Sequence, residues 1–159
     1  MHVTRQWCGT AYMPLRFVSA APHRGIIRSH MDDRHLSIIN DCQLVSVMNK
    51  TKWRELCTEF EALHSLSVSV RYKLITSDEI FGFSPVWWDE LFEQNRTIEW
   101  LDFDPIVKEH RGRLISDMEA DRTKEILGVF HKHCIRYSIQ ESYFRVWGYF
   151  SQSEQPTFV

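Results

Sequence analysis

Six carboxylates crowd the centre of the sequence and have the clearest potential for chemistry. They are Asp89, Glu90, Glu93, Glu99, Asp102 and Asp104. Paired carboxylates supply hard oxygen ligands for Mg²⁺ or a base whose pKa can be tuned. A metal-dependent hydrolase that uses Glu99, Asp102 and Asp104 is therefore one hypothesis. Because their spacing matches no metal or acid–base motif, solvated turns and a partner-facing acidic patch are the competing interpretations.

The run His131-Lys132-His133-Cys134 combines two residue types that bind zinc. Residues two apart on a helix point in different directions, and no second Cys or His pair stands at the spacing of a structural zinc site. Cationic side chains also suit the last turn of a helix, where they meet its dipole. The run therefore predicts a helix C-terminus, and no cofactor is expected.

An enzyme is the weaker class, since the sequence has no glycine-rich phosphate loop and no nucleophile elbow. Cys57 and Cys134 fall on positions predicted to be apolar helix faces, where a thiol has a raised pKa and is inert. The four cysteines of the chain stand far apart and form no Cys-x-x-Cys pair. They favour a reducing, cytoplasmic setting.

Trp87 and Trp88 are adjacent, so a regular strand or helix cannot direct both rings into one core. One of them is expected at the surface or in a second small core. An exposed tryptophan beside acidic residues has the composition of a binding hot spot. A further hypothesis places one of these rings in an apolar pocket of a small-ligand sensor.

The net charge of −2 hides an uneven distribution along the chain. Residues 1–30 contain four arginines and no acid, which leaves residues 31–159 with a net charge of −6. An acidic body argues against nucleic-acid binding, because it would not neutralise phosphates. It is compatible with a basic protein partner, and it is also an ordinary charge for solubility. No apolar run approaches the roughly eighteen residues of a membrane span, so we expect a soluble protein without a membrane partner.

A chain of 159 residues is expected to form one domain. Residues 1–30 mix proline, glycine and arginine without periodicity, and they are predicted to be a disordered or non-native extension, with Met31 as the natural start. Residues 31–150 make the predicted α+β domain. Residues 151–159 are predicted to be a flexible tail.

Apolar periodicity predicts the first elements of the domain. It indicates a helix over residues 32–48, with an apolar stripe that reaches its end, and a second helix over residues 51–64. Residues 67–76 alternate as a strand. Residues 80–85 are expected to be a loop or an irregular strand, and the pattern of residues 86–92 does not distinguish helix from strand.

Residues 97–105 are predicted to be the central strand, because they form the densest run of large apolar and acidic side chains. The apolar positions change phase after Trp100, which indicates a β-bulge or a strand buried on both faces. Pro105 cannot donate a ladder hydrogen bond. The strand should therefore end or leave the sheet there.

The last third of the domain begins with Ser116 and Glu119, which have the spacing of a capping box and predict a helix that ends near His133. Residues 135–139 and 143–150 then predict a hairpin. The sum is two N-terminal helices, a largely antiparallel sheet of about four to five strands, and one helix before a C-terminal hairpin. Because βαβ repetition is missing, the fold class is α+β.

Three blocks rich in tryptophan follow one another along the chain. They are Thr51-Lys52-Trp53-Arg54-Glu55-Leu56, Ile98-Glu99-Trp100-Leu101 and Tyr143-Phe144-Arg145-Val146-Trp147-Gly148-Tyr149. Together they resemble a family of small stand-alone bacterial proteins of uncharacterised function. The resemblance covers about residues 51–150 and carries no catalytic signature. Compact bacterial proteins of this sort are often considered as immunity proteins that neutralise a toxin, which the resemblance implies by analogy alone.

These observations favour a cytoplasmic protein-binding domain, with a toxin-neutralising immunity protein as one form of it. The expected partner is a basic protein, because charge complementarity speeds association and sets specificity. The candidate contact residues are Trp87, Trp88, Asp89, Glu90, Glu99, Asp102 and Asp104. The metal-dependent hydrolase and the small-ligand sensor are the alternatives.

Overall fold

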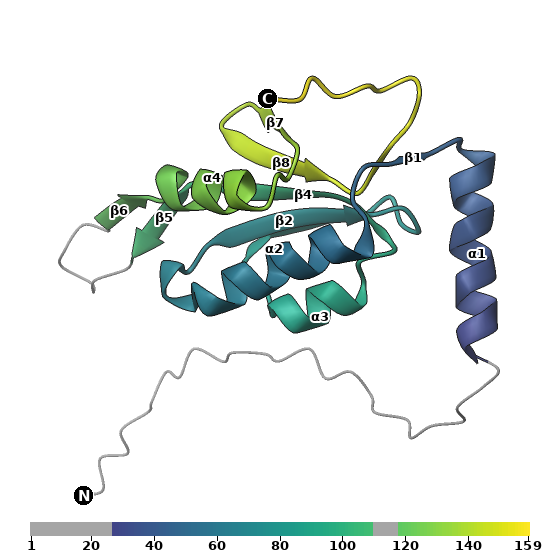
Figure 1. The fold of residues 1–159 in the computed structure, drawn as a ribbon, viewed down its shortest axis with the longest axis horizontal. Helices are drawn as coiled ribbons and strands as arrows, with labels where there is room; N and C mark the ends of the chain where they lie inside the picture. Colours follow the sequence, from purple (N-terminus) through teal and green to yellow (C-terminus); the bar gives the residue numbers. More distant parts are fainter. Residues whose placement is uncertain (1–26, 110–117) are drawn as a thin grey trace, which may run out of the picture.

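An antiparallel five-stranded sheet forms the centre of the protein, of which the computed structural model describes residues 27–109 and 118–159. In spatial order its strands are β3 (Ile80–Ser84), β2 (Ser69–Leu74), β4 (Ile98–Asp104), β8 (Tyr143–Trp147) and β7 (Tyr137–Gln140). The helices that pack on one face of the sheet are α2 (Lys50–Ala62), α3 (Trp88–Glu93) and α4 (Thr123–Lys132) (Figure 1). The predicted α+β class with a largely antiparallel sheet is confirmed.

Smaller elements surround this body. Two short sheets pair β1 (Val45–Ser46) with β9 (Tyr149–Phe150) and β5 (Ile106–Glu109) with β6 (Met118–Asp121). Helix α1 (Ile27–Asp41) stands to one side of the five-stranded sheet (Figure 1). Within the described ranges, no helix has both the length and the apolar character that crossing a membrane requires.

The central strand β4 is buried on both faces along most of its length. Leu101 and Phe103 face the helices, and Asp102 lies on the opposite face, each without accessible surface. Lys73 on β2 pairs with Trp100, and the next residue, Leu74, pairs with Ile98. Glu99, between these two β4 residues, is therefore the extra residue of a bulge. The sequence indicated a bulge or burial on both faces as alternatives, and β4 has both.

Pro105 marks the point where the chain leaves the five-stranded sheet. Strand β4 ends at Asp104, and β5 pairs with β6 in a separate sheet. The exit predicted at the proline is therefore confirmed. Residues 106–109, for which the sequence predicted no element, form β5.

Helix α2 carries the apolar stripe that its sequence predicts. Its buried residues are Trp53, Leu56, Cys57 and Phe60. Burial of each large side chain stabilises the fold by about 1.5–3 kcal/mol. Asn49 caps the helix, because its side chain accepts a hydrogen bond of 2.9 Å from the Lys52 N–H.

The helix predicted over residues 32–48 is wrong at its C-terminal end. Helix α1 stops at Asp41, and Gln43 follows with a φ of 50°, a left-handed conformation that ends a helix. The expected apolar stripe therefore breaks up. Val45 is exposed in β1, and Met48 enters the core from the segment between β1 and α2.

The capping box predicted at Ser116 and Glu119 is also wrong. Ser116 lies outside the described residues, and Glu119 pairs with Lys108 in the β5–β6 ladder. Helix α4 begins only at Thr123, whose N–H donates to the Asp121 carboxylate at 2.8 Å. The aspartate before the helix supplies the polar group that the sequence pattern placed five residues earlier.

The end of α4 and the hairpin after it follow the sequence. Helix α4 ends at Lys132, and β7 and β8 pair across a turn that contains Glu141. Cys134 departs from the prediction, because it is exposed and has a φ of 49° after the helix end. It therefore does not belong to the buried face of α4.

The tail predicted to be flexible runs back to the sheet. The N–H of Val159 donates to the carbonyl of Tyr137 at 3.0 Å, and the rings of Phe150 and Phe158 lie 6.4 Å apart. The last residue thus contacts the outer strand β7. The flexibility of residues 151–159 stays a prediction.

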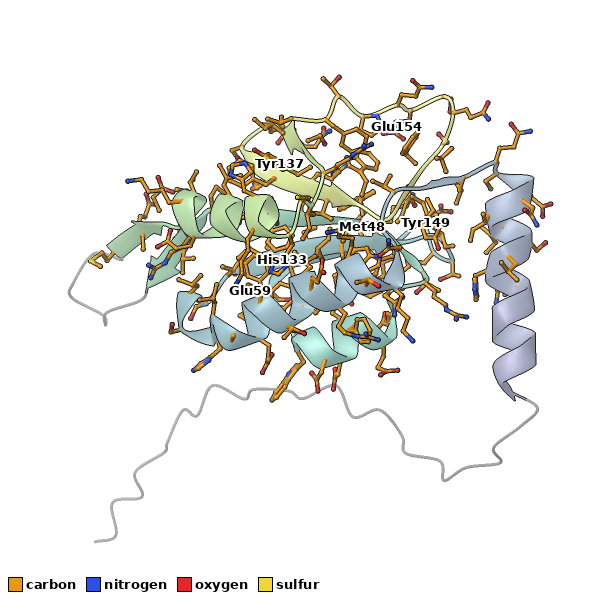
Figure 2. The ribbon with its side chains drawn as sticks, in the orientation of Figure 1. Met48, Glu59, His133, Tyr137, Tyr149 and Glu154 are labelled. Atoms are coloured by element: carbon orange, nitrogen blue, oxygen red, sulfur yellow. The ribbon has the colours of Figure 1, made fainter. Side chains whose placement is uncertain are left out.

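An ion-pair cluster joins α2 to the end of α4. Lys132 donates to the Glu59 carboxylate at 2.7 Å, and the His133 Nε2 atom lies 3.0 Å from it (Figure 2). The hydrogen bond from Lys132, followed by the one with His133, holds the pKa of Glu59 below its usual value of 4.5. The ionised carboxylate therefore stabilises the contact between the two helices.

This pKa predicts how stability changes in acid. Because the folded-state pKa of Glu59 is lowered, its contribution is present above the unfolded value and is lost as the pH falls through the folded value. We expect Glu59→Gln to be less stable than the parent at pH 7, and this difference to shrink below pH 4.5. Urea unfolding at a series of pH values measures it, with Glu154→Gln as control. Parallel pH profiles for parent and Glu59→Gln would contradict the prediction.

Candidate binding surface

The adjacent tryptophans at the start of α3 separate into one buried and one exposed ring. Trp88 is 7% exposed, and its ring stacks on Phe60 at 4.9 Å between centroids. Trp87 precedes the helix in an extended conformation and is 75% exposed. The expectation that the two rings could not share one core is confirmed.

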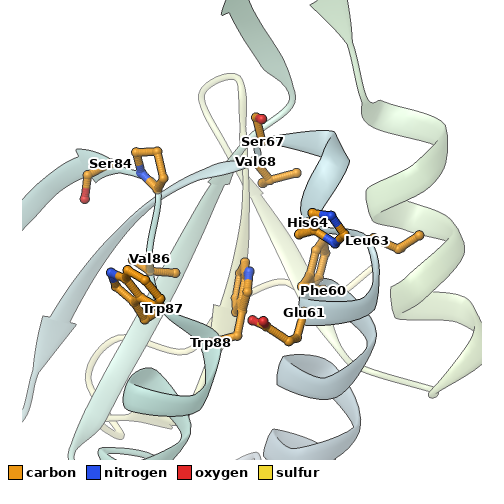
Figure 3. A pocket seen from close by; sticks show the side chains of 11 residues that line it. Phe60, Glu61, Leu63, His64, Ser67, Val68, Ser84, Val86, Trp87 and Trp88 are labelled. Carbon is orange, nitrogen blue, oxygen red and sulfur yellow. The ribbon is translucent and has the colours of Figure 1, made fainter.

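A cleft of about 520 Å³ lies beside the two rings (Figure 3). The end of α2, the short 3₁₀ helix η1 (His64–Leu66), the two residues between η1 and β2, and the connection from β3 to α3 line it. Phe60, Val68 and Trp88 give it an apolar lining. Figure 3 shows Trp87 and Glu61 on either side of Trp88, so an indole and a carboxylate flank the opening.

The carboxylates nearest to Trp87 in the chain are at the surface. Asp89 and Glu90 occupy the exposed first turn of α3, where negative charge suits the helix dipole. Asp89 also accepts a hydrogen bond of 2.9 Å from the Glu90 N–H. Trp87, Asp89, Glu90 and Glu61 are called the Trp87 surface below.

Asp102 has an entirely different environment. Its carboxylate accepts hydrogen bonds from Arg71 on β2 at 2.7 Å and from Arg145 on β8 at 2.6 Å, and it has no accessible surface. Both arginines stand directly opposite it in the sheet. The expectation that Asp102 faces a partner is therefore wrong, because two strands deliver cations to its side chain.

Aromatic rings complete the environment of the two arginines. The Arg145 guanidinium lies 3.9 Å from the centroid of a Trp100 ring, and the Arg71 guanidinium lies 4.9 Å from that of Phe83. Such stacking adds cation–π attraction to the ion pairs. The side of the sheet away from the helices is thus held together by a partly buried charged and aromatic layer.

Glu99 and Asp104, the other two carboxylates of the hydrolase hypothesis, each contact a different partner. Glu99 pairs with Lys73 at 2.8 Å, and Asp104 accepts from the Ile106 N–H at 2.9 Å. No group of three metal-ligating side chains occurs in the part of the chain that the structure describes. The structure therefore does not bring Glu99, Asp102 and Asp104 together as a metal site would require.

The thiol of Cys57 is unsuited to nucleophilic chemistry. Burial raises its pKa to about 12, so almost no thiolate forms at neutral pH. Its expected inertness is thus explained by its place in the core beside Trp53 and Phe60.

Residues 35–153 match the model of a family described as a family of unknown function, DUF6678. The chain belongs to this family. The DUF6678 region contains the whole five-stranded sheet, helices α2 to α4 and the Trp87 surface. No curated protein and no solved structure matches the sequence. The resemblance to an uncharacterised family that the three tryptophan-rich blocks indicated is confirmed.

The buried carboxylate makes a stability prediction within this DUF6678 fold. Removing the charge in Asp102→Asn leaves two partly buried guanidinium groups without their anion, so we expect a loss of about 3 kcal/mol. Asp104→Asn is the matched control on the same strand, and it should cost less than about 1 kcal/mol. Chemical unfolding of both variants measures the difference. Equal destabilisation of the two would contradict a special role for Asp102.

Proposed function

We propose that this chain is a protein-binding module that contacts its partner through the Trp87 surface. The observation that carries the proposal is the 75% exposure of Trp87. The other tryptophans of the described residues are at most 7% exposed. A large exposed ring on a well-packed base is typical of the aromatic anchors that dominate binding energy at interfaces.

The carboxylates of the Trp87 surface determine the sign of the partner. Asp89, Glu90 and Glu61 are all exposed and negative at neutral pH, so the surface is complementary to a basic protein. A toxin-neutralising immunity protein in the cytoplasm is one form that such a module takes. In that form, the Trp87 surface would cover a basic region of the toxin.

The test is affinity capture from a lysate of the source organism, with the full chain and its Trp87→Ala variant as paired baits. We expect the parent to retain a basic protein, and the variant to bind it about thirtyfold more weakly, which corresponds to about 2 kcal/mol for a hot-spot residue. Capture by the parent should also weaken at high salt, since exposed charges are screened.

Matched charge variants make this test specific. Asp89→Asn with Glu90→Gln should slow association, whereas Glu141→Gln with Glu154→Gln removes the same charge at other exposed positions and should not. Equal capture by the parent and Trp87→Ala would show that the partner uses another surface.

The cleft supports a second candidate function, that of a small-ligand sensor. Its volume of about 520 Å³ is typical of small-molecule sites, and Trp87 and Trp88 both line it. A metabolite bound there should quench the fluorescence of the parent, and the change should be smaller in Trp87→Ala, where Trp88 alone remains to report it. A broad metabolite screen without any such response would count against this candidate.

A further inference from the structure

Strand β3 is an open edge of the five-stranded sheet. Within residues 27–109 and 118–159, it pairs with β2 alone. An edge strand directs unpaired N–H and C=O groups away from the sheet, where an extended segment of another protein can add as a further strand. The opposite edge differs, because β7 accepts a hydrogen bond from the chain's own Val159.

The composition of β3 leaves this edge without the protection of charged side chains. Edge strands often carry lysine or another charge that prevents pairing. Ile80–Ser84 contains no charged residue, and the Ile80 side chain is 52% exposed. The edge therefore presents both open backbone groups and apolar surface.

A bulge in β3 gives the edge aromatic contacts on both faces of the sheet. Ser84 pairs with Val70 and Phe81 pairs with Tyr72, so two residues of β3 stand opposite Arg71. Phe81 stacks on Tyr72 at 4.7 Å, whereas Phe83 lies over Arg71. Both phenylalanines are only partly buried, so an added strand would cover their outer edges.

The chain segment that contains β3 carries charge of one sign, and the two cations of β2 opposite it, Arg71 and Lys73, are already paired with Asp102 and Glu99. Residues 74–95 contain five acids and no lysine or arginine. Asp78 and Glu79 are exposed before the strand, and Asp89 and Glu90 are exposed after it. A segment along β3 would therefore have carboxylates near both of its ends, which favours a basic segment.

We infer that β3 accepts an extended basic segment of a partner protein as an added strand. The segment alternates apolar side chains with lysine or arginine. The cleft beside Trp87, which Ser84 at the end of β3 also lines, holds one of its cationic side chains against the Trp87 ring, with the Glu61 carboxylate on the other side of the opening. This inference rests on the proposed function and adds to it the binding mode and the chemistry of the partner.

The test uses a labelled peptide of alternating lysine and valine, and the same peptide with alternate backbone nitrogens methylated. Methylation keeps the charge and removes N–H donors that an added strand needs. Fluorescence anisotropy with the full chain at low salt should show binding that is at least about tenfold weaker for the methylated peptide. Hydrogen exchange of the β3 amides should slow in the complex with the unmodified peptide.

Two isoleucines on opposite edges of the sheet provide a matched pair of variants. Ile80 on β3 and Ile139 on β7 are 52% and 56% exposed, so each accommodates lysine without loss of core packing. Ile80→Lys should weaken peptide binding at least about tenfold, and Ile139→Lys less than about twofold.

Equal affinity for the two peptides, or no binding of either, would overturn strand addition at β3. Neither result bears on the proposed function, which depends on capture of the natural partner by Trp87. Conversely, peptide binding that is sensitive to backbone methylation and to Ile80→Lys supports strand addition at β3, whereas equal capture of the natural partner by the parent and Trp87→Ala would contradict the proposed function alone.

Discussion

The carboxylate of Asp102 between the guanidinium groups of Arg71 and Arg145 is the contact on which the sheet depends. The three residues lie on three adjacent strands and stand directly opposite one another. A slip of β2 or β8 by one residue would turn its arginine to the other face of the sheet and leave the buried carboxylate with one cation in place of two. The pair of arginines therefore fixes the register of β2, β4 and β8, and with it the residues that face the core.

The register of these strands also explains why Trp87 is exposed. It places Phe103 under the helices, 5.0 Å from Phe60, and Phe60 in turn stacks on Trp88. Because Trp88 is held in this aromatic core, its neighbour Trp87 cannot enter the same core and points to solvent. The proposed binding surface is thus a consequence of how α3 is anchored, and the rigid sheet beneath it keeps the ring in place.

Local pattern was enough to predict the central strand, helix α2, the C-terminal hairpin, and that Trp87 and Trp88 do not share one core. It failed where the outcome depends on distant residues. Asp102 looked like a surface acid because its two arginines lie 31 and 43 residues away along the chain. The end of α1 depends on a left-handed residue, Gln43, that apolar periodicity does not reveal. The open edge at β3 follows from the order of strands, which spacing alone does not specify.

The central claim is that the Trp87 surface binds the partner, and the indole N–H resonances of the full chain test it most directly. On adding the captured partner, we predict a large shift for the exposed Trp87 indole, while the indoles of Trp53, Trp100 and Trp147 stay in place because they are buried. An unchanged Trp87 resonance, with the largest shifts at Trp100 or Trp147, would move the binding site to the other side of the sheet and contradict the account.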